Sequence, residues 1–394
     1  MTAVVKSSPS AELDDATLDL VRDRLASLGR DYTPVDVAAA MRAEGLALSD
    51  SAVLDAVESL RRHSVGAGPL EPLLREPGVT DVLVNGPDQV FVDRGAGLEL
   101  TDFRFSGESD VRRLAQRLAA SVGRRLDDAV PFVDARLPDG CRAHAVLGCL
   151  ASPGTCISLR VPAQRTFSLQ ECVASGSLTS GAAQLLTRMI EAKLAFLISG
   201  GTGSGKTTLL AALLALVPRH ERIVIVEDSR ELAPNHPHVV RIEGRPANAE
   251  LAGAISLTVL VRQSLRMRPD RLVVGEVRGG EICDLLTAMN TGHEGGCGTV
   301  HANSTADVPA RLEALASLGG LSRGALHAQL ASALDAVVHV VRDGGGTRRV
   351  AEISIFVRDP SSGLVRSESA LEFHADGSTV RGPGSSRLER MLDR

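Results

Sequence analysis

The chain has 394 residues, of which 44% are hydrophobic, and its 43 Lys and Arg residues against 48 Asp and Glu residues give a net charge of −5. A chain of this length can form two or three globular domains with substantial cores. The dispersed, slightly acidic charge and the aromatic content of 2% argue against the basic grooves and stacking platforms that bind nucleic acids.

The sequence also argues against a zinc ribbon and a membrane span. Its six cysteines contain no C-x-x-C pair, which favours free thiols in a reducing compartment. The longest apolar run has roughly half the length of a membrane-spanning helix, and the N-terminus lacks the apolar core of a signal peptide. We therefore expect a cytoplasmic protein that reaches any membrane through its partners.

The first segment, residues 1–64, is predicted to be helical after a disordered start of about ten residues. Apolar residues recur at helical spacing in 18–28, 37–41 and 53–60. Asp50 and Ser51 fit the N-cap of the third helix. A small helical unit of this kind usually packs on a neighbour, and we expect no catalysis in it.

Residues 65–162 are predicted to form an α+β domain. Strands are expected at 81–84, 89–93, 98–105, 141–147 and 156–161, the first three as a meander, with one helix over 111–122. Arg142 and Arg160 alternate with apolar residues, which places them on the polar faces of two strands. Spacing alone favours solvated surface positions for both arginines.

Residues 163–178 are predicted to be a linker, and residues 179–394 an α/β domain whose last twenty residues are weakly ordered. Short apolar runs occur at 223–226, 272–274, 298–300, 337–341 and 351–357. Such runs between helical stretches are typical of a mainly parallel sheet that helices cover on both faces. The run 209–217 is apolar all round, which predicts a buried central helix.

A glycine-rich loop precedes that helix, and it gives the clearest sign of function. Gly200, Gly205, Lys206 and Thr207 fit G-x-x-x-x-G-K-[ST] between an apolar strand and the helix. Backbone N–H groups of such a loop cradle phosphates, and the helix N-terminus adds positive potential. Lys206 is expected to reach the β- and γ-phosphates, and the Thr207 hydroxyl to hold Mg²⁺. The expected nucleotide-binding residues are Gly201, Thr202, Gly203, Ser204, Gly205, Lys206, Thr207 and Thr208.

The first acidic cluster follows the predicted strand 223–226, at the sheet edge where α/β proteins bind ligands. Glu227 is expected to orient water or to hold Mg²⁺. The alternative is structural, because Asp228 and Glu231 have the spacing of a capping box at the start of a helix.

The second cluster follows the predicted strand 272–274. Glu276 is expected to face the γ-phosphate and to position the attacking water. Gly275 stands where many P-loop enzymes carry a metal-binding Asp, so Thr207 and acids acting through water must hold the Mg²⁺.

A histidine cluster follows the predicted strand 298–300. His293 and His301 lie eight residues apart, and the sequence offers no third and fourth ligand at the spacing of a metal site. His301 is either a hydrogen-bonded core residue or a sensor of the γ-phosphate, and both possibilities stay open.

These segments resemble the motifs of one superfamily, in its order and spacing. ISGGTGSGKTTLL resembles Walker A, IVEDSREL the Asp box, LRMRPDRLVVGEVRGGE Walker B and TGHEGGCGTVHANS the His box. From about residue 68 to residue 343 the chain is similar to the secretion ATPases of type II and type IV systems. Within them it looks most like the tight-adherence pilus ATPases of the conjugal-transfer-associated type.

The resemblance implies a homohexameric ring that hydrolyses ATP with Mg²⁺ in a RecA-like domain, preceded by a smaller PAS-like domain. It places Arg142 and Arg160 where N-terminal arginines of the family swing onto the γ-phosphate, and it makes Arg278 a further nucleotide contact. Residues 147–154 lack the proline pair usual in the family, so the connection between the two arginine strands is expected to differ.

The resemblance also implies a role for the protein in the cell. The expected partner is an inner-membrane platform protein of a pilus or secretion system, with the ATPase peripheral to the inner face of the membrane and no nucleic acid bound. Two alternatives stay open: a RecA-like motor for conjugal DNA transfer, and a slow-cycling regulatory nucleotide-binding subunit.

Overall fold

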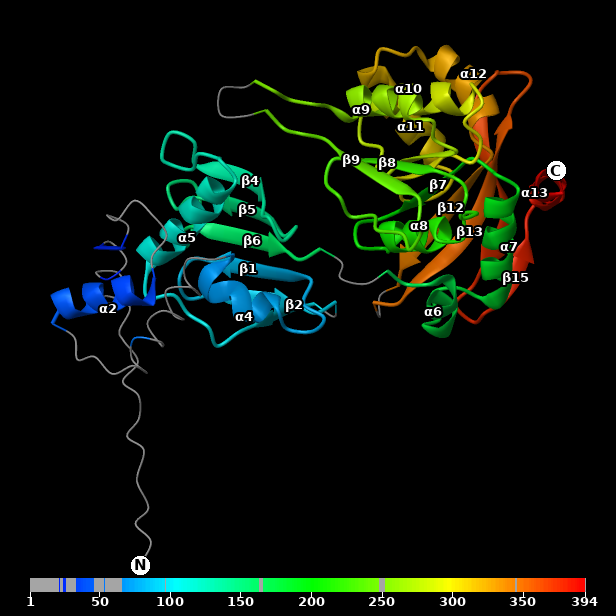
Figure 1. Ribbon diagram of the computed structural model, residues 1–394. Coiled ribbons are helices and arrows are strands. Elements are labelled where there is room, and N and C mark those ends of the chain that lie inside the picture. The colour runs from blue at the N-terminus through cyan, green and yellow to red at the C-terminus, as the bar shows by residue number, and fades with distance from the viewer. Residues whose placement is uncertain are drawn as a thin grey trace, which may run out of the picture. The chain divides into compact units, whose positions relative to one another are not determined.

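The computed structural model describes residues 21, 24–25, 33–45, 53, 66–95, 97–162, 166–247, 252–343 and 346–393. The chain divides into two compact units, Met1–Pro162 and Ala163–Arg394, each with its own core (Figure 1). Of the three predicted N-terminal helices, the middle one is α2, Pro34–Ala43. The predicted disordered start and the Asp50 and Ser51 caps lie outside the described residues.

The N-terminal unit contains a six-stranded antiparallel sheet of order β3-β2-β1-β6-β5-β4. Its strands are β1 Asp81–Asn85, β2 Val90–Asp93, β3 Leu98–Leu100, β4 Phe132–Arg136, β5 Arg142–Val146 and β6 Cys156–Arg160, and its helices include α4 Glu71–Leu74 and α5 Glu108–Ser121. The apolar face of the sheet and the Val111, Leu114 and Leu118 stripe of α5 form one core. The predicted α+β composition and the meander are therefore confirmed, although β4 was not predicted and β3 is shorter than expected.

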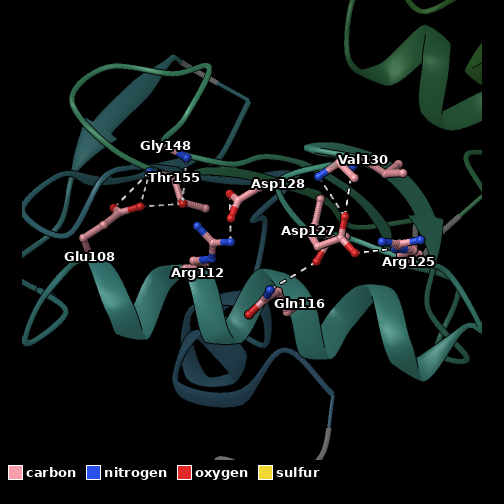
Figure 2. Close-up of polar contacts among 11 residues, drawn as sticks. Glu108, Arg112, Gln116, Arg125, Asp127, Asp128, Val130, Gly148 and Thr155 are labelled. Atoms are coloured by element: carbon pink, nitrogen blue, oxygen red, sulfur yellow. Dashed lines mark hydrogen bonds and ion pairs between the residues drawn. The ribbon is translucent and has the colours of Figure 1, made fainter.

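The connection between β5 and β6 is tied to the first turn of α5. The Glu108 carboxylate accepts hydrogen bonds from the Thr155 N–H at 2.9 Å and from its hydroxyl at 2.5 Å, and the Thr155 hydroxyl accepts from Gly148 N–H (Figure 2). A Cβ atom at Gly154 would lie only 2.3 Å from a Glu108 oxygen. Glu108 and two glycines, Gly148 and Gly154, thus fix this connection.

The larger unit is built on a nine-stranded sheet of order β15-β14-β13-β12-β7-β11-β10-β8-β9. Its strands are β7 Phe196–Gly200, β8 Ile223–Glu227, β9 Val239–Glu243, β10 Arg271–Val274, β11 Cys297–Val300, β12 Ala336–Arg342, β13 Arg348–Arg358, β14 Val365–Phe373 and β15 Thr379–Arg381. The six strands from β9 to β12 are parallel, and the other three continue the sheet antiparallel. The predicted mainly parallel sheet is confirmed.

Helices cover both faces of this sheet, as predicted (Figure 1). One face carries α6 Leu169–Ala174, α7 Ser180–Glu191, α8 Lys206–Leu214 and α13 Ser385–Leu392, and the other carries α9 Leu257–Ser264, α10 Glu281–Met289, α11 Val308–Leu318 and α12 Arg323–Ala333. Every residue of α8 from Leu209 to Leu214 is buried, which confirms the central helix.

Two expectations about the larger unit were wrong. The end of the chain is not weakly ordered, because α13 buries Leu388, Met391 and Leu392 in the core and Arg188 donates a 3.0 Å hydrogen bond to Glu389. Part of the predicted linker is the helix α6, whose N-cap Ser168 forms a capping box with Glu171. Both segments have a polar composition, and their apolar residues form only a short stripe.

Two further findings concern the whole described chain. None of its helices is both long and apolar enough to cross a membrane. All six cysteines are free thiols. The likeness of the N-terminal sheet to a PAS domain stays a prediction.

Candidate nucleotide-binding and catalytic site

The glycine-rich loop joins β7, the central strand of the nine-stranded sheet, to the buried helix α8. Gly203 (φ 69°) and Gly205 (φ 94°) have left-handed backbones that residues with a Cβ adopt only with strain. A Cβ at Gly200 would lie 2.2 Å from the Val340 carbonyl oxygen, whereas one at Gly201 would meet no atom within 4 Å. The loop is therefore closely packed at its base and open at Gly201, as a phosphate cradle requires.

Lys206, the first residue of α8, turns back into the loop. Its side chain is only 7% exposed, and its ammonium donates hydrogen bonds to Gly200 O at 3.1 Å and Gly201 O at 2.7 Å. Burial lowers the pKa of Lys206. A partly desolvated ammonium held by carbonyl oxygens is well placed to exchange those partners for phosphate oxygens.

The other polar residues predicted for the loop differ in exposure. The Ser204 side chain is buried, and its hydroxyl donates a 2.9 Å hydrogen bond to Gly201 O. Thr207 is half-buried, and Thr202 and Thr208 are exposed. Of these residues, Ser204 supports the loop from within, while the threonines lie where a ligand can reach them.

Glu276 and His301 follow β10 and β11, and the structure brings both to Lys206. His301 Nε2 lies 3.1 Å from a Glu276 oxygen, and His301 Nδ1 lies 3.5 Å from Lys206 Nζ. Because an ammonium can only donate, this geometry assigns the ring proton to Nε2, which then donates to Glu276. Burial, reinforced by the charge of Lys206, lowers the pKa of His301 and keeps the ring neutral.

Glu276 also pairs with Arg278, whose guanidinium donates a 2.5 Å hydrogen bond to the second carboxylate oxygen. Burial alone would raise the pKa of Glu276, but this bond and the surrounding positive charges outweigh burial and lower the pKa. The Glu276 carboxylate is thus ionised, and Arg278 and His301 orient it. The structure brings together four predicted site residues: Lys206, Glu276, Arg278 and His301.

Glu227 ends β8, beside β10, and is 4% exposed. One carboxylate oxygen accepts backbone hydrogen bonds from Glu231 at 3.0 Å and Leu232 at 2.9 Å, and the other is buried without a hydrogen-bond partner among the described residues. Burial raises the pKa of Glu227 to about 7. The alternative of a helix capped by Asp228 was wrong, because no helix follows Asp228 and the N–H groups of Glu231 and Leu232 bond to Glu227.

Gly275 explains why the usual metal-binding Asp has no room in this chain. A Cβ at Gly275 would lie 2.5 Å from Glu227 Cγ and 2.9 Å from one of its carboxylate oxygens. The buried Glu227 side chain thus occupies the space that a side chain at residue 275 would need.

A Mg²⁺ ion fits the oxygen donors of this region. Across the described ranges, no group of three or more His, Cys, Asp or Glu side chains could hold a metal by itself. Mg²⁺ usually takes one or two protein oxygens together with substrate phosphates and waters. The Thr207 hydroxyl and the orphaned buried oxygen of Glu227 are donors of that kind.

Arg142 and Arg160, in the N-terminal unit, are direct cross-strand partners on β5 and β6. Arg136 of β4 stands opposite Arg142, and Asp81 of β1 opposite Arg160, so three arginines and one aspartate form a row across four strands. Like charges directly opposite each other destabilise a sheet. Arg136 was not predicted, because β4 was not.

Sequence reasoning also missed side chains on the other side of the loop. Arg348, the first residue of β13, donates a 2.9 Å hydrogen bond to Gly203 O. On β12, the buried His339 lies 2.9 Å from the Ser199 hydroxyl of β7 through its Nδ1. A histidine inside the apolar run 337–341 was a signal for this buried polar pair, whereas Arg348 gave none because its contact depends on how the hairpin returns.

Comparisons with known proteins show the family of the chain. Residues 63–370 match the family described as "Type II/IV secretion system protein". The chain is 53% identical over 335 residues to a conjugal transfer protein of Mycobacterium tuberculosis, a match covering 84% of this chain and 94% of that protein. It is 33% identical over 319 residues to a PtlH homologue, a type IV secretion system protein of Bordetella bronchiseptica, with 74% and 93% covered.

Solved structures share the fold. The pilus retraction motor PilT with bound ADP has a TM-score of 0.51 and 20% identity, covering 82% of this chain and 85% of that one. The ATPase DotB of Legionella pneumophila has a TM-score of 0.50 and 19% identity, covering 74% and 80%. The resemblance read from the four motifs is confirmed, and the chain belongs to the family of type II/IV secretion system proteins.

Proposed function

We propose that this chain is a Mg²⁺-dependent ATPase that works as a motor of a secretion or pilus system. The observation that supports it best is the convergence of Lys206, Glu276 and His301, which follow β7, β10 and β11 in the chain, at the open side of the glycine loop. The loop provides a phosphate cradle, and the ionised carboxylate of Glu276 contacts the histidine beside Lys206.

Each residue then has a distinct task. Lys206 exchanges its loop carbonyls for the β- and γ-phosphate oxygens. Glu276 orients the attacking water and accepts its proton, while His301 holds the carboxylate and senses the phosphate beside Lys206. Arg278, released from Glu276, is a further phosphate contact. Thr207, and Glu227 through water, would hold a Mg²⁺ ion, which would supply positive charge at the transferring phosphate.

The arginine row of the N-terminal unit supplies the step that we propose couples hydrolysis to movement. Arg142 and Arg160, which are cross-strand partners on β5 and β6, would meet the γ-phosphate when the two units close on a nucleotide. A positioned arginine accelerates phosphoryl transfer by roughly 10³- to 10⁵-fold. We propose that closure occurs within a homohexameric ring, so that an isolated subunit hydrolyses slowly.

The output of the motor is proposed from the relatives. PtlH is a type IV secretion system protein, and PilT is a pilus retraction motor crystallised with ADP. We infer that this chain moves an inner-membrane platform protein from the cytoplasmic side and is closest in role to tight-adherence pilus ATPases. The conjugal transfer names of the Mycobacterium and Rhizobium radiobacter relatives favour one second candidate, a motor for DNA transfer.

The test is phosphate release from ATP in magnesium, compared with the same reaction in a chelator. Lys206→Ala is expected to abolish release, whereas Lys193→Ala, which removes an exposed lysine paired with Glu221, is expected to retain it. Absence of magnesium-dependent release by the wild-type protein at all concentrations and with membrane extracts would contradict the proposal. Stimulation of release by DNA would favour the second candidate.

A further inference from the structure

The hairpin of β12 and β13 brings two arginines to the glycine loop from the side opposite to Glu276 and His301. In the sheet, β12 flanks β7 on one side, whereas β11 and β10 lie on the other. The pairing of β12 with β7 runs up to Val340 opposite Gly200, where the loop begins. Arg342, two residues further, stands opposite Arg348 on β13.

Three contacts join this hairpin base to the loop. Arg348 Nε donates a 2.9 Å hydrogen bond to Gly203 O. The stem of Arg348 packs against Gly205, where a Cβ would lie 3.2 Å from Arg348 Cδ. A terminal nitrogen of Arg342 lies 3.8 Å from the position of a Cβ at Gly203. The absence of a side chain at Gly205 therefore makes room for Arg348 as well as for the backbone turn, whereas Arg342 would only be in ordinary van der Waals contact with a Cβ at Gly203.

The charges of this arrangement point to an anion. Arg342 and Arg348 are exposed and directly opposite each other in an antiparallel pair, which costs free energy through like-charge repulsion. The Gly203 carbonyl oxygen, which accepts from Arg348, compensates only part of the full charge of that guanidinium. The phosphate groups of a nucleotide on the loop would compensate the rest, because they carry several negative charges within reach of the same glycines.

We propose that Arg348, with Arg342 beside it, is a nucleotide-positioning residue. It fixes the peptide between Gly203 and Ser204, so that the loop N–H groups keep their direction, and it adds positive charge beside the phosphates. The nucleotide is thus held from both sides of β7. The inference rests on the proposed nucleotide binding and extends it to a hairpin outside the four family motifs.

The test measures affinity for a fluorescent ADP analogue by titration of the full chain. Arg348→Ala is expected to raise Kd on the order of tenfold, the effect of losing one charged hydrogen bond. The matched control is Arg358→Ala, at the opposite end of β13 from Arg348. There Arg358 Nε donates a 3.1 Å hydrogen bond to Gly363 O. Arg358→Ala is expected to leave Kd unchanged.

Two further measurements distinguish nucleotide positioning by Arg348 from a purely structural role of this residue. The melting temperature without nucleotide is expected to be the same for both variants, while the rise that ADP produces is smaller for Arg348→Ala. Arg348→Lys, which keeps the charge, is expected to recover part of the affinity and to decide the matter if the Ala variant does not fold.

The outcomes distinguish the two proposals. If the wild-type protein binds ADP and both Arg348 variants bind it as tightly as Arg358→Ala, the hairpin inference is overturned and the ATPase proposal stands. If the wild-type protein binds no ADP or ATP analogue, the proposed function fails, and the inference with it.

Discussion

Replacing the buried Glu227 by Gln should change how the stability of the protein depends on pH. Burial raises the pKa of Glu227 from 4.5 to about 7 in the folded protein, even though two backbone N–H groups bond one of its oxygens. The folded-state pKa therefore lies above the unfolded one. Between these two values the folded chain keeps a proton that the unfolded chain has released, so stability falls as pH rises through this window.

The magnitude follows from the shift. Each pKa unit corresponds to about 1.4 kcal/mol, so Glu227 costs roughly 3 kcal/mol of stability above pH 7 relative to its contribution below pH 4.5. Glu227→Gln keeps an oxygen that can accept both backbone N–H groups but has no proton to lose. The free energy of unfolding of the variant minus that of the wild-type protein should therefore increase by about 3 kcal/mol across the window.

The assay is urea unfolding at a series of pH values, followed by far-ultraviolet circular dichroism because the chain has no Trp and one Tyr. Because the chain has two compact units, the comparison uses the transition that Glu227→Gln shifts. Parallel stability curves for the two proteins, with a constant offset from acid to neutral pH, would refute the burial argument.

Four other substitutions test the site and the core. Glu276→Gln should lower kcat by about 10²- to 10⁴-fold with little change in ADP affinity. If ADP affinity and kcat fell by the same factor, Glu276 would not have the proposed role of orienting the attacking water. Arg142→Ala and Arg160→Ala should each reduce kcat, by up to about 10³-fold, while ADP still binds; wild-type turnover in both would remove the arginine row from the mechanism. Leu388→Ala, in α13, should lower the free energy of unfolding by about 3 kcal/mol and so the melting temperature, whereas an unchanged melting temperature would mean that α13 is not part of the core.

Much of the larger unit was predictable because its parallel strands are buried on both faces. Apolar runs mark β8 and β10, and the carboxyl ends of the parallel strands meet at one edge of the sheet. That rule predicted that Glu276 would face the phosphates, while His301 stayed open between a core residue and a sensor. In the structure His301 lies 3.1 Å from Glu276 and 3.5 Å from Lys206.

What escaped prediction depends on packing between distant segments. The pKa of Glu227 depends on its burial against Gly275, which follows another strand. The contact of Arg348 with Gly203 depends on the register of an antiparallel return, which sequence periodicity does not specify. The helix α13 was missed because Gly, Ser and Arg dominate the composition around its short apolar stripe.

The central claim is that this chain hydrolyses ATP at the glycine loop and needs assembly to do so efficiently. Phosphate release per subunit, measured against protein concentration with magnesium and ATP and with Lys206→Ala as the blank, tests both parts at once. The account predicts magnesium-dependent release that rises with concentration as subunits assemble. Release that stays at the level of the blank at every concentration, with membrane extract present, would contradict it.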